Sequence, residues 1–194
     1  MSGPARTLIG AALALAAQVV LAQVPSGGFF LVAKPSILDP NFSRTVVLVT
    51  PTPEGGILGV ILNRRMNQSL AELLPGNERL ARFTEPLGFG GPVEPGGLFA
   101  VFRGTAEPGP SFPIIDDVRL ALQPPTVEQL LLKPPETMRL FVGYAGWAPG
   151  QLDNELARGD WWTLKADLDS IFRKDTETLW DELVRRARSV TALR

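Results

Sequence analysis

The chain has 194 residues, of which 45% are hydrophobic, and its formal net charge is −1. This size is sufficient for one packed core, and the near-neutral charge gives no general attraction to nucleic acid. The absence of cysteine and histidine excludes disulfides, thiolate or imidazole metal sites and catalysis by a Ser-His-Asp or Cys-His arrangement. These exclusions favour a protein that is not an enzyme and that needs no cofactor.

The first 22 residues have the pattern of a cleaved secretory signal peptide. Arg6 is the only charged residue before an apolar run at residues 8–22, which is too short to span a bilayer comfortably. We expect cleavage before Gln23, a mature domain at residues 23–194 that is periplasmic or secreted, and no transmembrane span after cleavage. The alternative is a misassigned start or a cytoplasmic N-terminal helix.

Strands are expected first at residues 29–33 (FFLVA) and 45–50 (TVVLVT), where β-branched and aromatic residues lie between Pro and Gly. The turn sequence PEGG at residues 53–56 predicts a hairpin that returns at residues 57–63. Ser69 and Glu72 have the spacing of a capping box, which predicts the start of a short helix.

The middle of the chain is rich in Gly and Pro. Residues 87–97 (LGFGGPVEPGG) are expected to be irregular, with a strand resuming at residues 98–103. Further expected strands are 118–122, 138–144 and 161–164, and further expected helices are 126–133, 151–158, 167–172 and 176–187. This mixture of strands, hairpins and helices favours an α+β fold.

The segment GYAGWAPGQLDNELARGDWW, residues 143–162, is predicted to be a strand, a turn, a short helix and a second strand. On the helix, Gln151 and Glu155 are one turn apart and form a polar face, whereas Leu152 and Leu156 form a buried face. The polar face beside Trp147 is a candidate contact surface for a small ligand. A purely structural role explains the same residues equally well.

Two other segments contain candidate site residues. In DPNFSR, residues 39–44, Arg44 is expected either to pair with Asp39 or to bind a ligand carboxylate or phosphate. The glycine-rich segment at residues 88–93 is either a backbone nest for an anion or a tight loop in which glycines permit positive φ and close backbone approach. The tight loop is favoured because no helix begins after it.

Four ordered motifs resemble the YqgE/AlgH family, also called UPF0301 or domain of unknown function 179. These are AKPSILDPNFSRTVVLV, GVILNR, FGGPVEPGGLF and GYAGWAPGQLDNEL followed by WWTLKAD, and the resemblance covers residues 29–188. It implies an α+β fold with a bulged, twisted, largely antiparallel sheet and flanking helices. It implies no established activity. Members are generally cytoplasmic, and some are called transcriptional regulators.

The positions that match the family motifs supply the candidate binding surface. Its expected residues are Asp39, Pro40, Phe42, Arg44, Asn63, Gly90, Gly91, Pro92, Tyr144, Trp147, Gln151 and Glu155.

Three functions are compatible with these residues. The favoured one is a non-enzymatic binding or interaction protein for a small molecule or a protein partner, using a groove between the glycine loop and the Trp147 helix. The second is a hydrolase or transferase with Glu155 or Asp39 as general base and Arg44 as electrostatic partner. The third is a transcriptional regulator, although no helix-turn-helix with a basic face is present, so nucleic acid is not an expected partner.

Overall fold

The computed structural model describes residues 27–104 and 108–192, so the expected signal peptide lies outside the described part. The strands are β1 (Phe29–Ala33), β2 (Val46–Pro51), β3 (Ile57–Ile61), β4 (Arg65–Ser69), β5 (Pro86–Phe89), β6 (Val93–Arg103), β7 (Phe112–Pro113), β8 (Val118–Ala121), β9 (Met138–Trp147) and β10 (Trp161–Lys165). The helices are α1 (Leu70–Leu73), α2 (Pro124–Leu132), α3 (Gln151–Arg158), α4 (Leu168–Phe172) and α5 (Leu179–Ala192).

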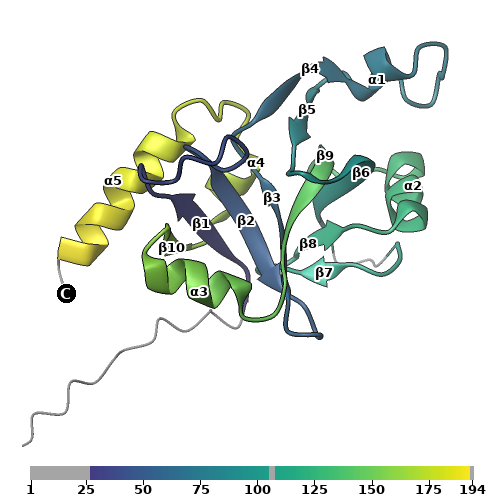
Figure 1. The fold of residues 1–194 in the computed structure, drawn as a ribbon. Coiled ribbons are helices and arrows are strands. Elements are labelled where there is room, and N and C mark those ends of the chain that lie inside the picture. Colours follow the sequence, from purple (N-terminus) through teal and green to yellow (C-terminus); the bar gives the residue numbers. More distant parts are fainter. Residues whose placement is uncertain (1–26, 105–107, 193–194) are drawn as a thin grey trace, which may run out of the picture.

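The strands form a curled sheet in the order β10-β1-β2-β3-β9-β6-β8-β7 (Figure 1). Neighbours along this order are antiparallel, and β5 pairs in parallel with β9. Between β6 and β9 the register shifts, because β6 advances from Val93 to Leu98 while β9 advances only from Tyr144 to Val142. The fold is therefore α+β with a bulged, largely antiparallel sheet, as the family resemblance implied.

The strands β1 to β3 are buried on both faces, which explains their almost continuous apolar sequences. Successive side chains of a strand point to opposite faces, and on β1 they enter two separate cores. Phe30 and Val32 pack in the core beneath α4 and α5, whereas Phe29 and Leu31 pack in the core beneath α3.

Most of the expected elements are present. The helix at residues 151–158 is confirmed as α3, which ends at Gly159 in the left-handed conformation. The Ser69–Glu72 capping box is also confirmed. No helix within the described residues is long and apolar enough to cross a membrane.

The boundaries of three elements differ from those predicted. Helix α2 begins at Pro124 rather than Thr126, because proline suits the first turn of a helix. Strand β9 continues to Trp147, because Ile57 of β3 pairs with that residue. Helix α5 begins at Leu179, later than expected, and continues to Ala192.

The expectation that residues 87–97 are irregular is wrong. Most of this segment belongs to β5 and β6, which both pair with β9. Backbone hydrogen bonding to a buried neighbouring strand outweighs the weak local preference of glycine and proline against extended structure. The polar strand β4 was not predicted either, and its residues are mostly exposed.

The segment that joins β5 to β6 crosses over β9. Val142 of β9 pairs with Phe89 of β5 and also with Leu98 of β6, so these strands occupy opposite edges of β9. A Cβ atom on Gly90 would overlap the carbonyl oxygen of Gly143, and one on Gly143, whose φ is +69°, would overlap that of Gly91. Glycine is required here because the two backbones touch.

Gly143→Ala is expected to lower the free energy of unfolding by about 3 kcal/mol or more, because the added methyl group meets backbone and the left-handed φ is strained. Gly96→Ala is the matched control, since no atom lies within 4 Å of a Cβ at that position. The control should change stability by no more than about 0.5 kcal/mol. Urea unfolding of both variants provides the measurement, and equal effects would contradict the crossing.

Candidate functional site

Trp147, Gln151 and Glu155 form a closed hydrogen-bonded cluster with Trp161. The indole nitrogens of Trp147 and Trp161 both donate to Oε2 of Glu155 at 2.9 Å, and Gln151 donates to Oε1 at 3.1 Å. The side chain of Phe42 packs against both indoles, with ring centroids 5.8 Å away. Trp147 is only 5% exposed, so it is a core residue rather than an open platform.

The loop between β1 and β2 holds the next group of expected site residues. The Asn63 side chain accepts a hydrogen bond from the Val46 amide and donates one to the Arg44 carbonyl, which fastens the end of this loop to β3. Oδ1 of Asp39 accepts from the Asn41 amide at 2.7 Å, as in a local turn. The carbonyl of Pro40 accepts from the Arg64 guanidinium at 2.6 Å.

Arg44 does not pair with Asp39, contrary to one of the expected arrangements. Its guanidinium lies over the Trp180 ring at 4.2 Å and pairs with Asp181 at 3.3 Å. Trp180 belongs to the core beneath α5, whereas Glu155 belongs to α3 on the other face of the sheet. The structure therefore does not bring Arg44 and Glu155 together.

Gly90, Gly91, Pro92 and Tyr144 lie at the strand crossing. The Gly90 amide donates to the carbonyl of Val142 at 2.8 Å. The Tyr144 ring packs edge-to-face on Phe99 with centroids 5.3 Å apart, and Pro92 is exposed just beyond the crossing. The expected site residues thus fall into three groups: the Glu155 cluster, the β1–β2 loop and the crossing.

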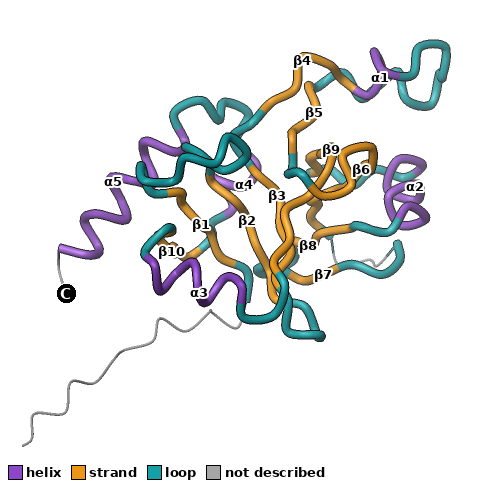
Figure 2. Tube along the Cα trace, viewed as in Figure 1, coloured by secondary structure: helices purple, strands orange, loops and turns teal. Residues whose placement is uncertain are grey.

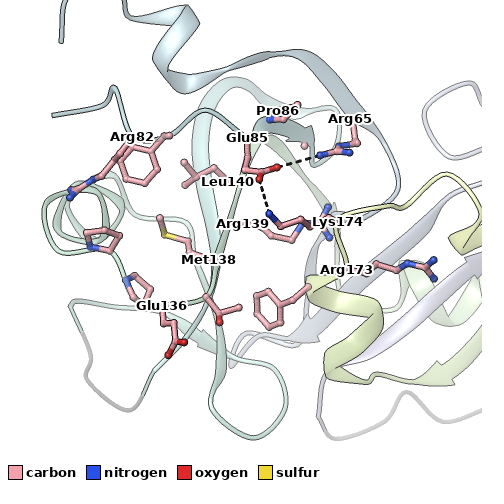
Figure 3. Close-up of a pocket in the computed structure, with 16 residues that line it drawn as sticks. Arg65, Arg82, Glu85, Pro86, Glu136, Met138, Arg139, Leu140, Arg173 and Lys174 are labelled. Atoms are coloured by element: carbon pink, nitrogen blue, oxygen red, sulfur yellow. Dashed lines mark hydrogen bonds and ion pairs between the residues drawn. The ribbon is translucent and has the colours of Figure 1, made fainter. Parts of the chain in front are cut away.

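A cavity of about 420 Å³ lies elsewhere, between the start of β9, the end of α4 and the arm formed by residues 65–89. The arm contains β4, α1 and β5. Strand β5 pairs with β9, and the end of the arm that carries α1 extends away from the rest of the molecule (Figure 2). Five cations line the cavity, together with Glu85 and Glu136. These cations are Arg65, Arg82, Arg139, Arg173 and Lys174 (Figure 3).

Arg139 is the least hydrated of these cations. Its guanidinium donates to the carbonyl of Ile171 at 2.7 Å and to that of Leu62 at 2.8 Å, and it lies 5.1 Å from the Phe141 ring. No carboxylate pairs with it in the part of the chain that the structure describes. Desolvation, with a smaller contribution from Arg65, lowers the pKa of Arg139 to about 10.

Glu85 joins the arm to the end of α4. Its carboxylate pairs with Lys174 at 2.9 Å and with Arg65 at 3.7 Å, as the dashed lines in Figure 3 show. The hydrogen bond from Lys174 is the main reason that the pKa of Glu85 is lowered. Arg173 is engaged separately by Glu182 at 2.7 Å.

None of the cavity residues was among the expected site residues. The one sequence signal was Arg139 itself, a lone charge in the apolar strand sequence MRLFVGY. Its companions come from segments far apart in the chain, so sequence patterns do not group them.

Comparison with known proteins identifies the family. The family model described as DUF179, AlgH-like, matches residues 30–191. The chain belongs to the AlgH-like family. A UPF0301 protein of Streptomyces avermitilis is 35% identical over 175 residues, covering 86% of this chain and 89% of that protein. A UPF0301 protein of Myxococcus xanthus is 33% identical over 158 residues, covering 80% and 87%.

Solved structures show the same AlgH-like fold. The solution structure of the AlgH protein from Pseudomonas aeruginosa has a TM-score of 0.68 at 26% identity and covers 84% of this chain and 90% of that one. A crystal structure of a Corynebacterium diphtheriae protein has a TM-score of 0.66 at 25% identity, covering 84% and 88%.

Tyr144 is the single tyrosine in this AlgH-like chain, so its ionisation can be followed alone. Desolvation, aided by the charge of Glu94, raises its pKa above 10.0. Because the folded pKa is the higher one, the resulting stability is present below pH 10 and is lost as pH rises through the folded value. Ultraviolet titration of the phenol should give a midpoint above that of the urea-unfolded chain. Equal midpoints in the folded and the urea-unfolded chain would contradict the desolvation of the Tyr144 phenol.

Proposed function

We propose that this AlgH-like chain is a non-enzymatic binding protein that takes up a small anion in the Arg139 cavity. The observation that carries the proposal is a largely desolvated guanidinium whose partners are two carbonyls and whose charged neighbour is another cation. A buried charge without a counterion is costly, and an anion bound beside it would remove that cost. Guanidinium groups are also well suited to bidentate contact with oxyanions.

Binding is better supported than catalysis by the residues that line the cavity. Of its two carboxylates, Glu85 is already engaged by Lys174 and Arg65, so it is poorly placed as a general base. The residues of the alternative hydrolase hypothesis have structural partners: Glu155 holds two indoles, and Arg44 holds Asp181. These contacts favour a binding function over a catalytic one.

Glu85 occupies the cations that a bound anion would use. Its carboxylate pairs with Arg65 of the arm and with Lys174 just after α4, and there it acts as an internal substitute for a ligand (Figure 3). An incoming anion must compete with it for Arg65 and Lys174. Changes to Arg139 and to Glu85 should therefore shift affinity in opposite directions.

Titration calorimetry with inorganic phosphate at low ionic strength tests the site. Arg139→Gln should weaken binding about tenfold or more, and Arg65→Gln should weaken it severalfold, because each removes a charge-assisted contact. Glu85→Gln should strengthen binding about threefold or more, because it removes the competing carboxylate while the ion pair it breaks is exposed and contributes little stability.

Arg103→Gln is the matched control for Arg65→Gln. Both arginines are paired with one carboxylate, and their side chains are similarly exposed, at 42% and 40%. The control changes net charge equally but lies outside the cavity lining, so phosphate affinity should stay unchanged. Undetectable phosphate binding, or equal losses in the two variants, would overturn the proposal.

We also infer that the protein acts outside the cytoplasm. The support is the apolar segment at residues 8–22 with a single preceding charge, which is typical of a secretory signal. Protein recovered from a periplasmic fraction should begin at Gln23. An intact N-terminus in the cytoplasmic fraction alone would contradict export and leave the binding proposal standing.

A further inference from the structure

We infer that the ligand of the Arg139 cavity is an organic phosphate monoester: a dianionic head on an apolar body. This inference rests on the proposed function and adds the chemical class of the ligand. Two observations support it independently. One is the number of positive charges left over at one end of the cavity, and the other is the group of apolar side chains in the rest of its wall.

The charged end of the cavity has an excess of two positive charges. Arg65 and Lys174 share the single carboxylate of Glu85, and Arg139 has no carboxylate partner among residues 27–104 and 108–192. Two positive charges therefore remain close together. A monocarboxylate would neutralise one of them, whereas a phosphate monoester carries between one and a half and two negative charges at about pH 7.

These charged groups are gathered in one part of the cavity. Figure 3 shows Arg65, Glu85, Arg139 and Lys174 together, with Leu140 and Met138 on the side toward Arg82 and with Arg82 and Glu136 farther away. Arg82 and Glu136 have opposite charges, so they do not alter the excess at the other end. The phosphate head is therefore expected next to Arg139 and not next to Arg82.

The remaining wall contains a group of apolar side chains beside the polar ones of Arg82, Glu136, Thr137 and Arg173. Met138 and Leu140 contribute from β9, Phe83 from the arm, and Pro134 and Pro135 from the connection between α2 and β9. The cavity volume of about 420 Å³ is within the range of roughly 300–1,000 Å³ typical of small-molecule sites. An inorganic phosphate would leave this apolar part filled with water, and an apolar substituent would displace that water favourably.

Calorimetry with phenyl phosphate, inorganic phosphate, benzoate and phenol tests the ligand class. Phenyl phosphate should bind at least tenfold more tightly than either inorganic phosphate or benzoate, and phenol should not bind measurably. Arg139→Gln should weaken both phosphates by a similar factor, because each places its head against this residue.

Met138→Ala tests the contact of the ligand's apolar body separately from the contact of its phosphate head with Arg139. It should weaken phenyl phosphate severalfold and leave inorganic phosphate unchanged. Met66→Ala is the matched control, because Met66 packs against the small core of the arm and does not line the cavity. It should leave both affinities unchanged.

The outcomes distinguish this inference from the proposed function. If inorganic and phenyl phosphate bind with equal affinity, the inference that the ligand has an apolar body is wrong, and the proposed anion site stands. If benzoate binds as tightly as phenyl phosphate, the phosphate class is wrong. If no anion binds, both the inference and the proposed function fail.

Discussion

Two backbone segments cross in direct contact in this protein, Gly90 and Gly91 against Gly143, and the rest of the fold depends on that contact. The crossing places β5 on one edge of β9 and β6 on the other, so β9 has strands on both sides where it is most buried. No side chain fits between the two backbones, since a Cβ on any of the three glycines would overlap main-chain atoms. The glycine-rich segment is therefore a requirement of topology, and its extended structure follows from pairing with β9.

The same crossing creates the space for the candidate site. After β3 the chain forms the arm of residues 65–89, and the last strand of the arm, β5, comes back to pair with the edge of β9 (Figure 1). Strand β5 pairs with β9 only at Phe141 and Val142. Before Phe141, this edge of β9 has no strand of the described residues beside it, and Met138 and Leu140 line the cavity together with the arm and the end of α4. Arg139 lies at this edge, bound to carbonyls from β3 and α4 regions that the sheet brings together.

The residues that look most chemical in the sequence have structural partners. Glu155 accepts hydrogen bonds from two indoles, and Asn63 connects the β1–β2 loop to β3. Buried indole and amide groups must be satisfied, so a carboxylate or an amide beside tryptophan is often part of the core. The cavity, by contrast, is lined by arginine, lysine, glutamate, proline and apolar residues, and apart from Arg139 these gave no signal in the sequence. Such residues acquire a role only when several of them surround one space.

Much of the architecture was determined by the sequence alone. Apolar runs specify β1, β2 and β3, the Ser69–Glu72 pair specifies a helix start, and the 3.6-residue spacing specifies α3, because these are local preferences of neighbouring residues. Four motifs were sufficient to indicate the family. Only the tertiary structure decided that most of residues 87–97 belongs to strands, that Arg44 pairs with Asp181, and that Arg65, Glu85, Arg139 and Lys174 meet. Those outcomes depend on hydrogen bonds, desolvation and charge between segments distant in sequence, which no local pattern records.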